Sequence, residues 1–158
     1  MKSINIFITL LICLLIPLSI GGISGFATAA SITDWYVTLN KPSFNPPNYL
    51  FAPVWTTLYS LMGISLFLVW RSPEGRNRNN ALFIFAVQMI LNFIWSFLFF
   101  KFNLIGVALV EIVLLWISIL IMITFFRRVS KLAAFIQIPY LLWVFFASVL
   151  NAAIWFLN

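Results

Sequence analysis

The residues best suited to holding a ligand are tryptophans, tyrosines and side-chain amides that lie inside long apolar stretches. Aromatic rings offer flat apolar surfaces and amides offer hydrogen bonds, which suits a large, flat, mostly apolar ligand with polar edges. Taken singly, an aromatic stripe more often reflects packing, and an amide within a span also serves as an interhelical hydrogen bond. At helical spacing these residues share three faces: Phe51, Trp55 and Tyr59; Gln88, Asn92, Trp95 and Phe99; and Tyr140, Trp143, Ala147 and Asn151.

The sequence offers little for conventional catalysis. It contains no general acid/base pair, no nucleophile with a base and no phosphate-binding loop. It has no histidine and a single cysteine, Cys13, so we expect no metal site. Glu111 is the only formal charge inside the apolar stretches, and both a structural role and a proton-relay role are open for it. We therefore do not expect a conventional enzyme.

Five apolar stretches must position these side chains. They cover residues 4–26, 48–70, 81–100, 104–126 and 132–157. Each has the length of about 20 residues that a helix needs to cross a hydrocarbon layer of ~30 Å. The hydrophobic fraction is 64% and the charged fraction 8%, far from globular values. The sequence thus predicts an all-α membrane protein, a five-transmembrane-helix bundle that forms one domain over residues 1–158. The first stretch is too long for a signal peptide and is expected to be retained.

The net charge of +6 reflects topology rather than nucleic-acid binding. The cations lie at the ends of the apolar stretches, where they can also contact anionic headgroups of the lipid bilayer. The asymmetry between the two sides predicts a cytoplasmic N-terminus and an external C-terminus. One side carries Lys2, Arg71, Arg76, Arg78, Arg127, Arg128 and Lys131, and the other side carries Lys41 and Lys101.

The connection 27–47 is the longest on the outer side and carries Trp35, Tyr36 and Phe44, which need an apolar surface to cover. Asn45 is expected to be the N-cap of the second helix. At 1.5 Å per residue, Trp55, Asn92, Trp95, Glu111 and Asn151, on four helices, lie about 8–12 Å below the outer helix ends. The sequence therefore predicts a pocket in the outer half of the bundle, beneath this connection.

These residues also carry a resemblance to a known family, the tryptophan-rich sensory proteins and translocator proteins (TspO/MBR). The similarity covers nearly the whole chain in order and spacing. Its first block is Trp35, Tyr36, Leu39, residues 41–47, Phe51, residues 53–55, Leu58 and Tyr59. Its further blocks are Gln88, Leu91, Asn92, Trp95, Ser96, Phe99 and Phe100, then residues 139–141, Trp143, Phe146, Ala147, Leu150 and Asn151.

The resemblance implies a porphyrin-binding membrane protein. It implies a pocket closed by the first loop, usually in a homodimer, and binding of protoporphyrin IX or haem as ligand, with no cofactor required. The role implied is tetrapyrrole sensing, transport or regulation in a bacterial cell membrane. The alternative is light- and oxygen-dependent porphyrin degradation in the same pocket, for which Trp55 and Trp143 match the implicated tryptophans. Residues 151–158 lack the tyrosine and basic residue of the animal cholesterol motif.

The face analysis and the resemblance together give one set of expected ligand-binding residues. The set combines the outer connection, the aromatic walls and the amides. Its members are Tyr36, Lys41, Phe51, Trp55, Tyr59, Gln88, Asn92, Trp95, Phe99, Trp143, Ala147 and Asn151.

Overall fold

The computed structural model describes residues 5–158, so Lys2 and Ile4, which the sequence analysis used, lie outside the described residues. Within these residues the chain forms helices and no strands, and five helical segments are long and apolar enough to cross a membrane. This confirms the predicted fold class. The elements are α1 (Ile6–Asp34), η1 (Tyr36–Thr38), η2 (Asn48–Leu50), α2 (Phe51–Trp70), α3 (Arg76–Ser96), η3 (Phe97–Lys101), α4 (Ile105–Val129), α5 (Lys131–Ile136) and α6 (Ile138–Leu157).

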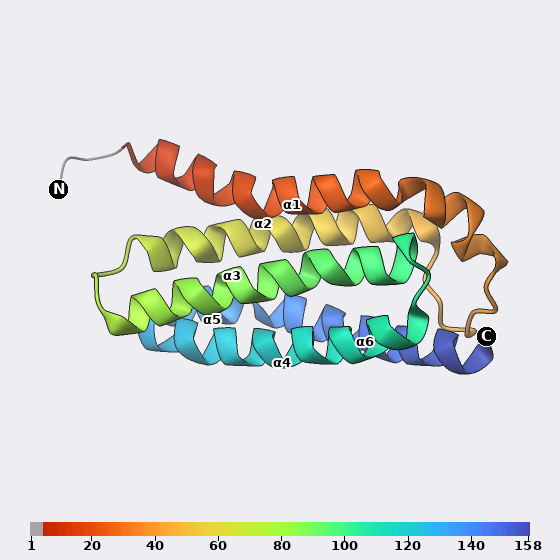
Figure 1. Ribbon diagram of the computed structural model, residues 1–158. Coiled ribbons are helices and arrows are strands. Elements are labelled where there is room, and N and C mark those ends of the chain that lie inside the picture. Colours follow the sequence, from red (N-terminus) through yellow and green to blue (C-terminus); the bar gives the residue numbers. More distant parts are fainter. Residues whose placement is uncertain (1–4) are drawn as a thin grey trace.

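The long helices run side by side in one elongated bundle (Figure 1). The connection between α2 and α3 and the end of α4 lie at one end of the bundle, and η1, η2 and the C-terminus lie at the other end. Helix α1 packs mainly on α2, and α4 packs on α3 and α6. Large apolar side chains also cover the outside, among them Phe26 at 89% and Val110 at 64% exposed, as expected where lipid is the solvent.

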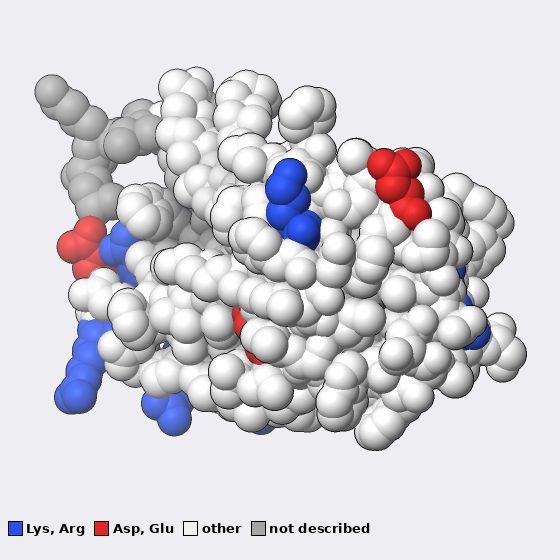
Figure 2. All heavy atoms as spheres, turned by 45° about the vertical axis from the view of Figure 1, so that its right-hand side comes forward, with Lys and Arg blue, Asp and Glu red and all other residues white. Residues whose placement is uncertain are grey.

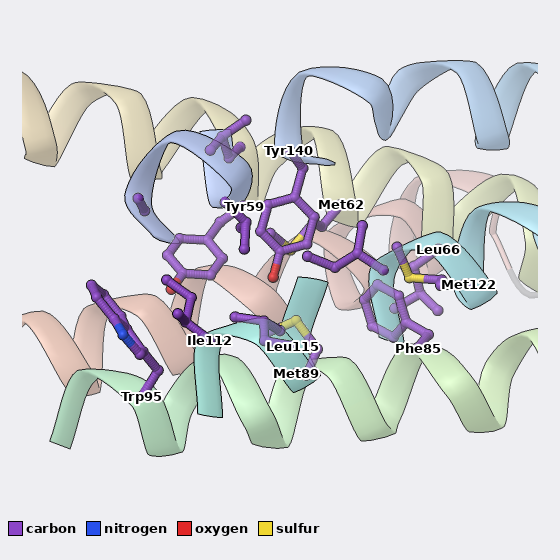
Figure 3. Packing of buried hydrophobic residues seen from close by; sticks show 14 of the residues in the cluster. Tyr59, Met62, Leu66, Phe85, Met89, Trp95, Ile112, Leu115, Met122 and Tyr140 are labelled. Atoms are coloured by element: carbon purple, nitrogen blue, oxygen red, sulfur yellow. The ribbon is translucent and has the colours of Figure 1, made fainter. Parts of the chain in front are cut away.

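The bundle interior changes in character along its length. Figure 3 shows Trp95 and Tyr59 toward one end of the core, Tyr140 beside Tyr59, and Leu66, Phe85 and Met122 toward the other end. Tyr140 is 1% exposed although it carries a hydroxyl group. Tyrosine and tryptophan side chains therefore gather in one half of the core, and aliphatic, methionine and phenylalanine side chains fill the other half.

Two helix boundaries differ from the sequence prediction by five residues or more. Helix α1 continues past Phe26 to Asp34, so the predicted connection 27–47 is too long. The small residues in this stretch do not break a helix, and Thr28 Oγ1 donates to the Ser24 carbonyl at 2.8 Å. Helix α3 begins at Arg76 rather than at Ala81, because the polar residues 76–80 continue the helix beyond the apolar stretch, at the level of the lipid headgroups.

The fifth apolar stretch forms two helices, α5 and α6, which meet at Gln137. Pro139 lies in the first turn of α6, where its missing N–H costs nothing. The Gln137 side chain is fully buried, and its Nε2 donates to Ser65 Oγ at 2.7 Å and to the Leu61 carbonyl at 3.2 Å. Ser65 Oγ donates in turn to the Ala133 carbonyl at 3.0 Å. The helix break is thus fixed by hydrogen bonds to α2.

The closest approach of α1 and α2 gives a first testable prediction. A Cβ added at Gly63 would lie 2.7 Å from Leu14 Cα and 2.9 Å from the Cys13 carbonyl oxygen, and backbone atoms cannot move aside locally. We expect Gly63→Ala to lower the stability of the detergent-solubilised protein by roughly 1–3 kcal/mol, the usual cost of overpacking. Thermal unfolding monitored by circular dichroism measures this. The control is Gly22→Ala, since a Cβ at Gly22 meets nothing within 4 Å. Equal melting temperatures for the two variants would contradict the prediction.

Candidate functional site

A cavity lies beneath the outer connection, enclosed by α2, α3, α6 and η1. Its volume is about 30 Å³. Eight of the twelve expected ligand-binding residues line it: Tyr36, Phe51, Trp55, Trp95, Phe99, Trp143, Ala147 and Asn151. Phe100, Leu150 and Ile154 also line it and were missed. Leu150 and Ile154 lie three residues beyond Ala147 and Asn151, so helical spacing would have identified both.

Two tryptophans form opposite parts of the aromatic wall. The Trp55 ring stacks on Tyr59 with 5.5 Å between centroids and meets the edge of Tyr140 at 6.4 Å. Trp143 meets Phe51 edge-on at 6.3 Å. The Trp143 Nε1 atom is buried and has no hydrogen-bond partner within residues 5–158. Buried indole N–H groups usually have an acceptor, so this donor is available to a polar atom of a ligand.

The third tryptophan is held by hydrogen bonds between helices. Trp95 Nε1 donates to Asn151 Oδ1 at 3.1 Å, and Asn151 Nδ2 donates to the Ile105 carbonyl at 2.9 Å. These bonds join α3, α6 and the first turn of α4. Trp95 also stacks on Phe99 at 5.5 Å. Asn151 therefore fixes the position of Trp95 in the wall, and one N–H of its amide has no partner among the described residues.

A π-helical turn brings two phenylalanines to the cavity. In η3 the chain makes wider turns than an α-helix, and the Phe102 N–H donates to the Phe97 carbonyl at 2.9 Å. Phe99 and Phe100 lie edge to face with 4.8 Å between their rings. Consecutive residues line the cavity here, as Leu150 and Asn151 do in α6, and a search at spacings of three and four residues passes over one member of such a pair. This explains why Phe100 was missed.

The outer connection covers the cavity as a lid, defined here as residues 35–47. The buried Tyr36 ring packs against Phe51, Phe99 and Phe100 with centroids 5.7–6.5 Å apart. Its hydroxyl donates to Asn45 Oδ1 at 2.7 Å. The expectation that Asn45 caps the second helix is therefore wrong, because its side chain holds Tyr36 and Pro47 precedes η2.

The end of α6 holds the lid at a second point. The Asn40 N–H donates to Asn158 Oδ1 at 2.9 Å, and Asn158 Nδ2 donates to the Asn40 carbonyl at 2.9 Å. Lys41 does not line the cavity. Its Nζ lies 4.9 Å from the centre of the Tyr36 ring and donates to the Leu39 carbonyl at 3.1 Å. Lys41 thus lies over the ring of Tyr36, on the side away from the cavity that Tyr36 lines.

Three further expected residues, Tyr59, Gln88 and Asn92, do not line the cavity but form a hydrogen-bond chain beneath it. Tyr59 Oη donates to Asn92 Oδ1 at 2.6 Å. Asn92 Nδ2 donates to Tyr140 Oη at 3.0 Å, and Tyr140 Oη donates to Gln88 Oε1 at 2.9 Å. The chain joins α2, α3 and α6. It supports Trp55 indirectly, because Trp55 contacts both tyrosine rings.

Glu111, on α4, is 7% exposed, and neither carboxyl oxygen has a hydrogen-bond partner within the described residues. The one ion pair found between described side chains joins Arg78 to Glu74, at the far end of the bundle. A structural role for Glu111 paired with a donor therefore has no support among the described residues, and a structural role as a protonated carboxyl and a proton-relay role both stay hypotheses.

The hydrogen-bond chain gives a second prediction. In Tyr140→Phe the ring remains, but Asn92 Nδ2 and Gln88 Oε1 both lose their partner in the core. We expect a loss of stability of about 1 kcal/mol, since interhelical hydrogen bonds in membranes contribute modestly and buried unpaired groups add a penalty. Thermal unfolding in detergent tests this, with Tyr49→Phe as the control because Tyr49 is 75% exposed. A melting temperature equal to that of the control would mean that the chain does not stabilise the bundle.

Comparison with known proteins places this arrangement in a family. Residues 13–156 match the sequence profile of the TspO/MBR family. The chain belongs to the TspO/MBR family. It is 43% identical over 152 residues to the "Tryptophan-rich protein TspO" of Chlorobaculum tepidum, covering 96% of each chain. It is 42% identical over 145 residues to a protein of the same name from Archaeoglobus fulgidus, covering 92% of this chain and 94% of that one.

Animal members of the TspO/MBR family are also similar. The human "Translocator protein" is 37% identical over 123 residues, covering 77% of this chain and 73% of that one. Family membership and the five membrane-spanning helical segments make this an integral membrane protein. The predicted resemblance to the TspO/MBR family is thus confirmed across nearly the whole described chain.

Proposed function

We propose that this protein binds a tetrapyrrole, such as protoporphyrin IX or haem, in the cavity beneath the lid, and acts in its sensing, transport or regulation. The observation that carries the proposal is the lining of the cavity. Indole and phenyl rings from three helices offer stacking surfaces for a macrocycle, and Trp143 Nε1 offers an unused donor. The names of two relatives, the human "Translocator protein" and the "Tryptophan-rich sensory protein" of Cereibacter sphaeroides, support a transport or sensory role.

The proposal requires the lid to open. Sites for drug-sized ligands enclose about 300–1,000 Å³, whereas this cavity encloses about 30 Å³. On this proposal the structure corresponds to a closed form, in which ring packing fills most of the site. A macrocycle would replace the Tyr36 contacts with Phe51, Phe99 and Phe100, and its propionates would then lie near Lys41 at the outer surface.

Titration of protoporphyrin IX in the dark tests the proposal directly. Purified protein in detergent is titrated while tryptophan fluorescence is recorded, with an unrelated tryptophan-containing membrane protein as the control for partitioning into micelles. We expect saturable quenching with a stoichiometry of one porphyrin per chain. Quenching that rises linearly without saturation, as in the control, would contradict the proposal.

A second candidate function is degradation of the porphyrin in light and oxygen. Its support is the contact of oxidisable rings at the cavity, since Trp55 touches both Tyr59 and Tyr140. Illumination of the saturated complex, with product analysis by chromatography, distinguishes the two functions. Binding without degradation gives only the photobleaching seen with free porphyrin in micelles. Degradation gives a discrete product whose yield falls in Trp55→Phe.

The proposed orientation in a bacterial cell membrane puts the lid outside and the N-terminus in the cytoplasm. It is supported by the positions of the cations, most of which in Figure 2 lie toward the end that carries the α2–α3 connection. The proposed homodimer rests on family resemblance. On α1 a Cβ added at Gly25 would meet nothing within 4 Å, so a second chain could approach the helix at this position. Accessibility of single cysteines to impermeant reagents and light scattering of the purified protein test these two proposals.

A further inference from the structure

A second and larger cavity lies in the other half of the bundle, between α1, α2 and α3. Its volume is about 490 Å³, within the range of about 300–1,000 Å³ typical of ligand sites. Thr9, at one end of the α1 wall, is its only residue with a polar side chain apart from Cys13 and Trp70. Figure 1 shows the first half of α1 leaning away from α2, with Pro17 near the middle of the helix. The missing N–H of a proline bends a helix, which accounts for the opening.

The dimensions of this cavity match one leaflet of a bilayer. Its α1 wall extends from Thr9 to Ile20. The eleven steps between these two residues, at 1.5 Å each, give about 16 Å, close to half of a hydrocarbon core of ~30 Å. The opposite wall is formed by Leu82, Ala86 and Ile90 of α3. A slot of this length with apolar walls can hold an extended hydrocarbon chain.

The end of the slot that faces the α2–α3 connection is basic. Trp70 lines the slot, and the Arg78 guanidinium lies 5.2 Å from the centre of its ring. Arg78 Nη1 pairs with Glu74 at 3.2 Å, whereas Arg78 Nε is buried without a partner within the described residues. Arg71 and Arg76 lie beside it in sequence and are exposed. Three arginines against one glutamate leave a positive charge at the headgroup level.

We propose that this slot is a binding site for an anionic phospholipid, with one acyl chain between α1, α2 and α3 and the phosphate at Arg78. The apolar walls explain the chain, and the arginines explain the preference for a negative headgroup. Guanidinium groups bind phosphate oxygens with two parallel hydrogen bonds, so Arg78 suits this role better than a lysine would. The site is separate from the aromatic cavity, since the two share no lining residue.

Native mass spectrometry of the purified protein tests the proposal with two lipids of identical chains, phosphatidylglycerol and phosphatidylcholine. Ala86→Phe fills the slot with a larger side chain, and Arg78→Gln removes the proposed phosphate contact. Two controls match them. Val110→Phe adds a phenyl ring to a lipid-facing position that is 64% exposed, outside the slot. Arg128→Gln removes an arginine that also lies 5.2 Å from an aromatic ring, that of Phe125 on α4.

We expect one phosphatidylglycerol to stay bound per chain, with retention at least fivefold above that of phosphatidylcholine. Ala86→Phe and Arg78→Gln should each lower retention at least fivefold, while both controls retain the lipid as the unchanged protein does. Equal retention in all variants would show only annular lipid and overturn the proposal. A change of oligomeric state in Ala86→Phe without a change in lipid retention would also overturn it, because the slot would then hold a second copy of the chain. Melting temperatures confirm that each variant is folded.

Discussion

Truncating either cavity tryptophan is expected to weaken protoporphyrin IX binding about thirtyfold. Trp55 and Trp143 both line the cavity, so Trp55→Ala or Trp143→Ala removes a stacking surface. An aromatic contact contributes about 0.5–1.5 kcal/mol beyond the burial of its area, and burial adds about 25 cal/mol per Å². A loss of about 2 kcal/mol corresponds to roughly thirtyfold in the dissociation constant. The change in the porphyrin absorption band during a dark titration measures it without relying on the deleted fluorophore.

The conservative variant and a matched control sharpen this test. Trp143→Phe keeps a ring but loses the unpartnered Nε1 donor. A smaller loss, about fivefold, is expected if that donor binds the porphyrin, consistent with about 1 kcal/mol for a hydrogen bond. Trp116→Ala is the control, because Trp116 packs on Phe145 and does not line the cavity. If all three positions weakened binding equally, the porphyrin would not occupy this cavity.

Locking the lid to α6 is expected to slow porphyrin binding by at least tenfold. The side-chain amide of Asn158 forms two hydrogen bonds of 2.9 Å with the backbone of Asn40, so the two residues are neighbours in the fold. Asn40→Cys with Asn158→Cys, made in a Cys13→Ser background, should form a disulfide that keeps the lid closed over a cavity of about 30 Å³. Stopped-flow fluorescence measures the association rate of protoporphyrin IX with the oxidised and the reduced protein.

Reduction should restore the rate of the Cys13→Ser background, and the single variant Asn40→Cys should show no dependence on reductant. Mass spectrometry verifies that the disulfide has formed. Equal association rates for the oxidised and the reduced protein would show that porphyrin reaches its site without movement of the lid at this point. Porphyrin would then have to reach the expected stacking residues through an opening between the helices.

The fold was predictable because lipid imposes a simple rule: each long apolar stretch must form a helix whose backbone groups bond within it. Helix ends were less predictable, because hydropathy does not register where a helix stops. Residues 27–34 contain no strong helix breaker, so α1 continues through them. The break at Gln137 depends on bonds to Ser65 and Leu61 of α2, partners that are distant in sequence.

The location of the candidate site was predictable from the sequence, but the small volume of its cavity was not. Depth along each helix put Trp55, Trp95 and Asn151 in one layer, and all three line the cavity, whereas Asn92 and Glu111, expected at the same depth, do not. The volume of the cavity depends on how Tyr36 packs into it, which no spacing rule gives. Gln88 and Asn92 were expected to meet a ligand because polar groups within spans are usually functional. They instead bond to tyrosines beneath the cavity.

We expect the chain of Tyr59, Asn92, Tyr140 and Gln88 also to limit where the bundle can deform. It crosses three helices at the level just below the cavity, so the helix ends above it can separate while the region below stays in register. The helix ends would then bend at the level of this chain. Backbone amides above it should be less protected against hydrogen exchange than those below it. Strain from a bound macrocycle would stop at this level. Movement of the lid would therefore leave unchanged the half of the bundle that contains the proposed lipid slot.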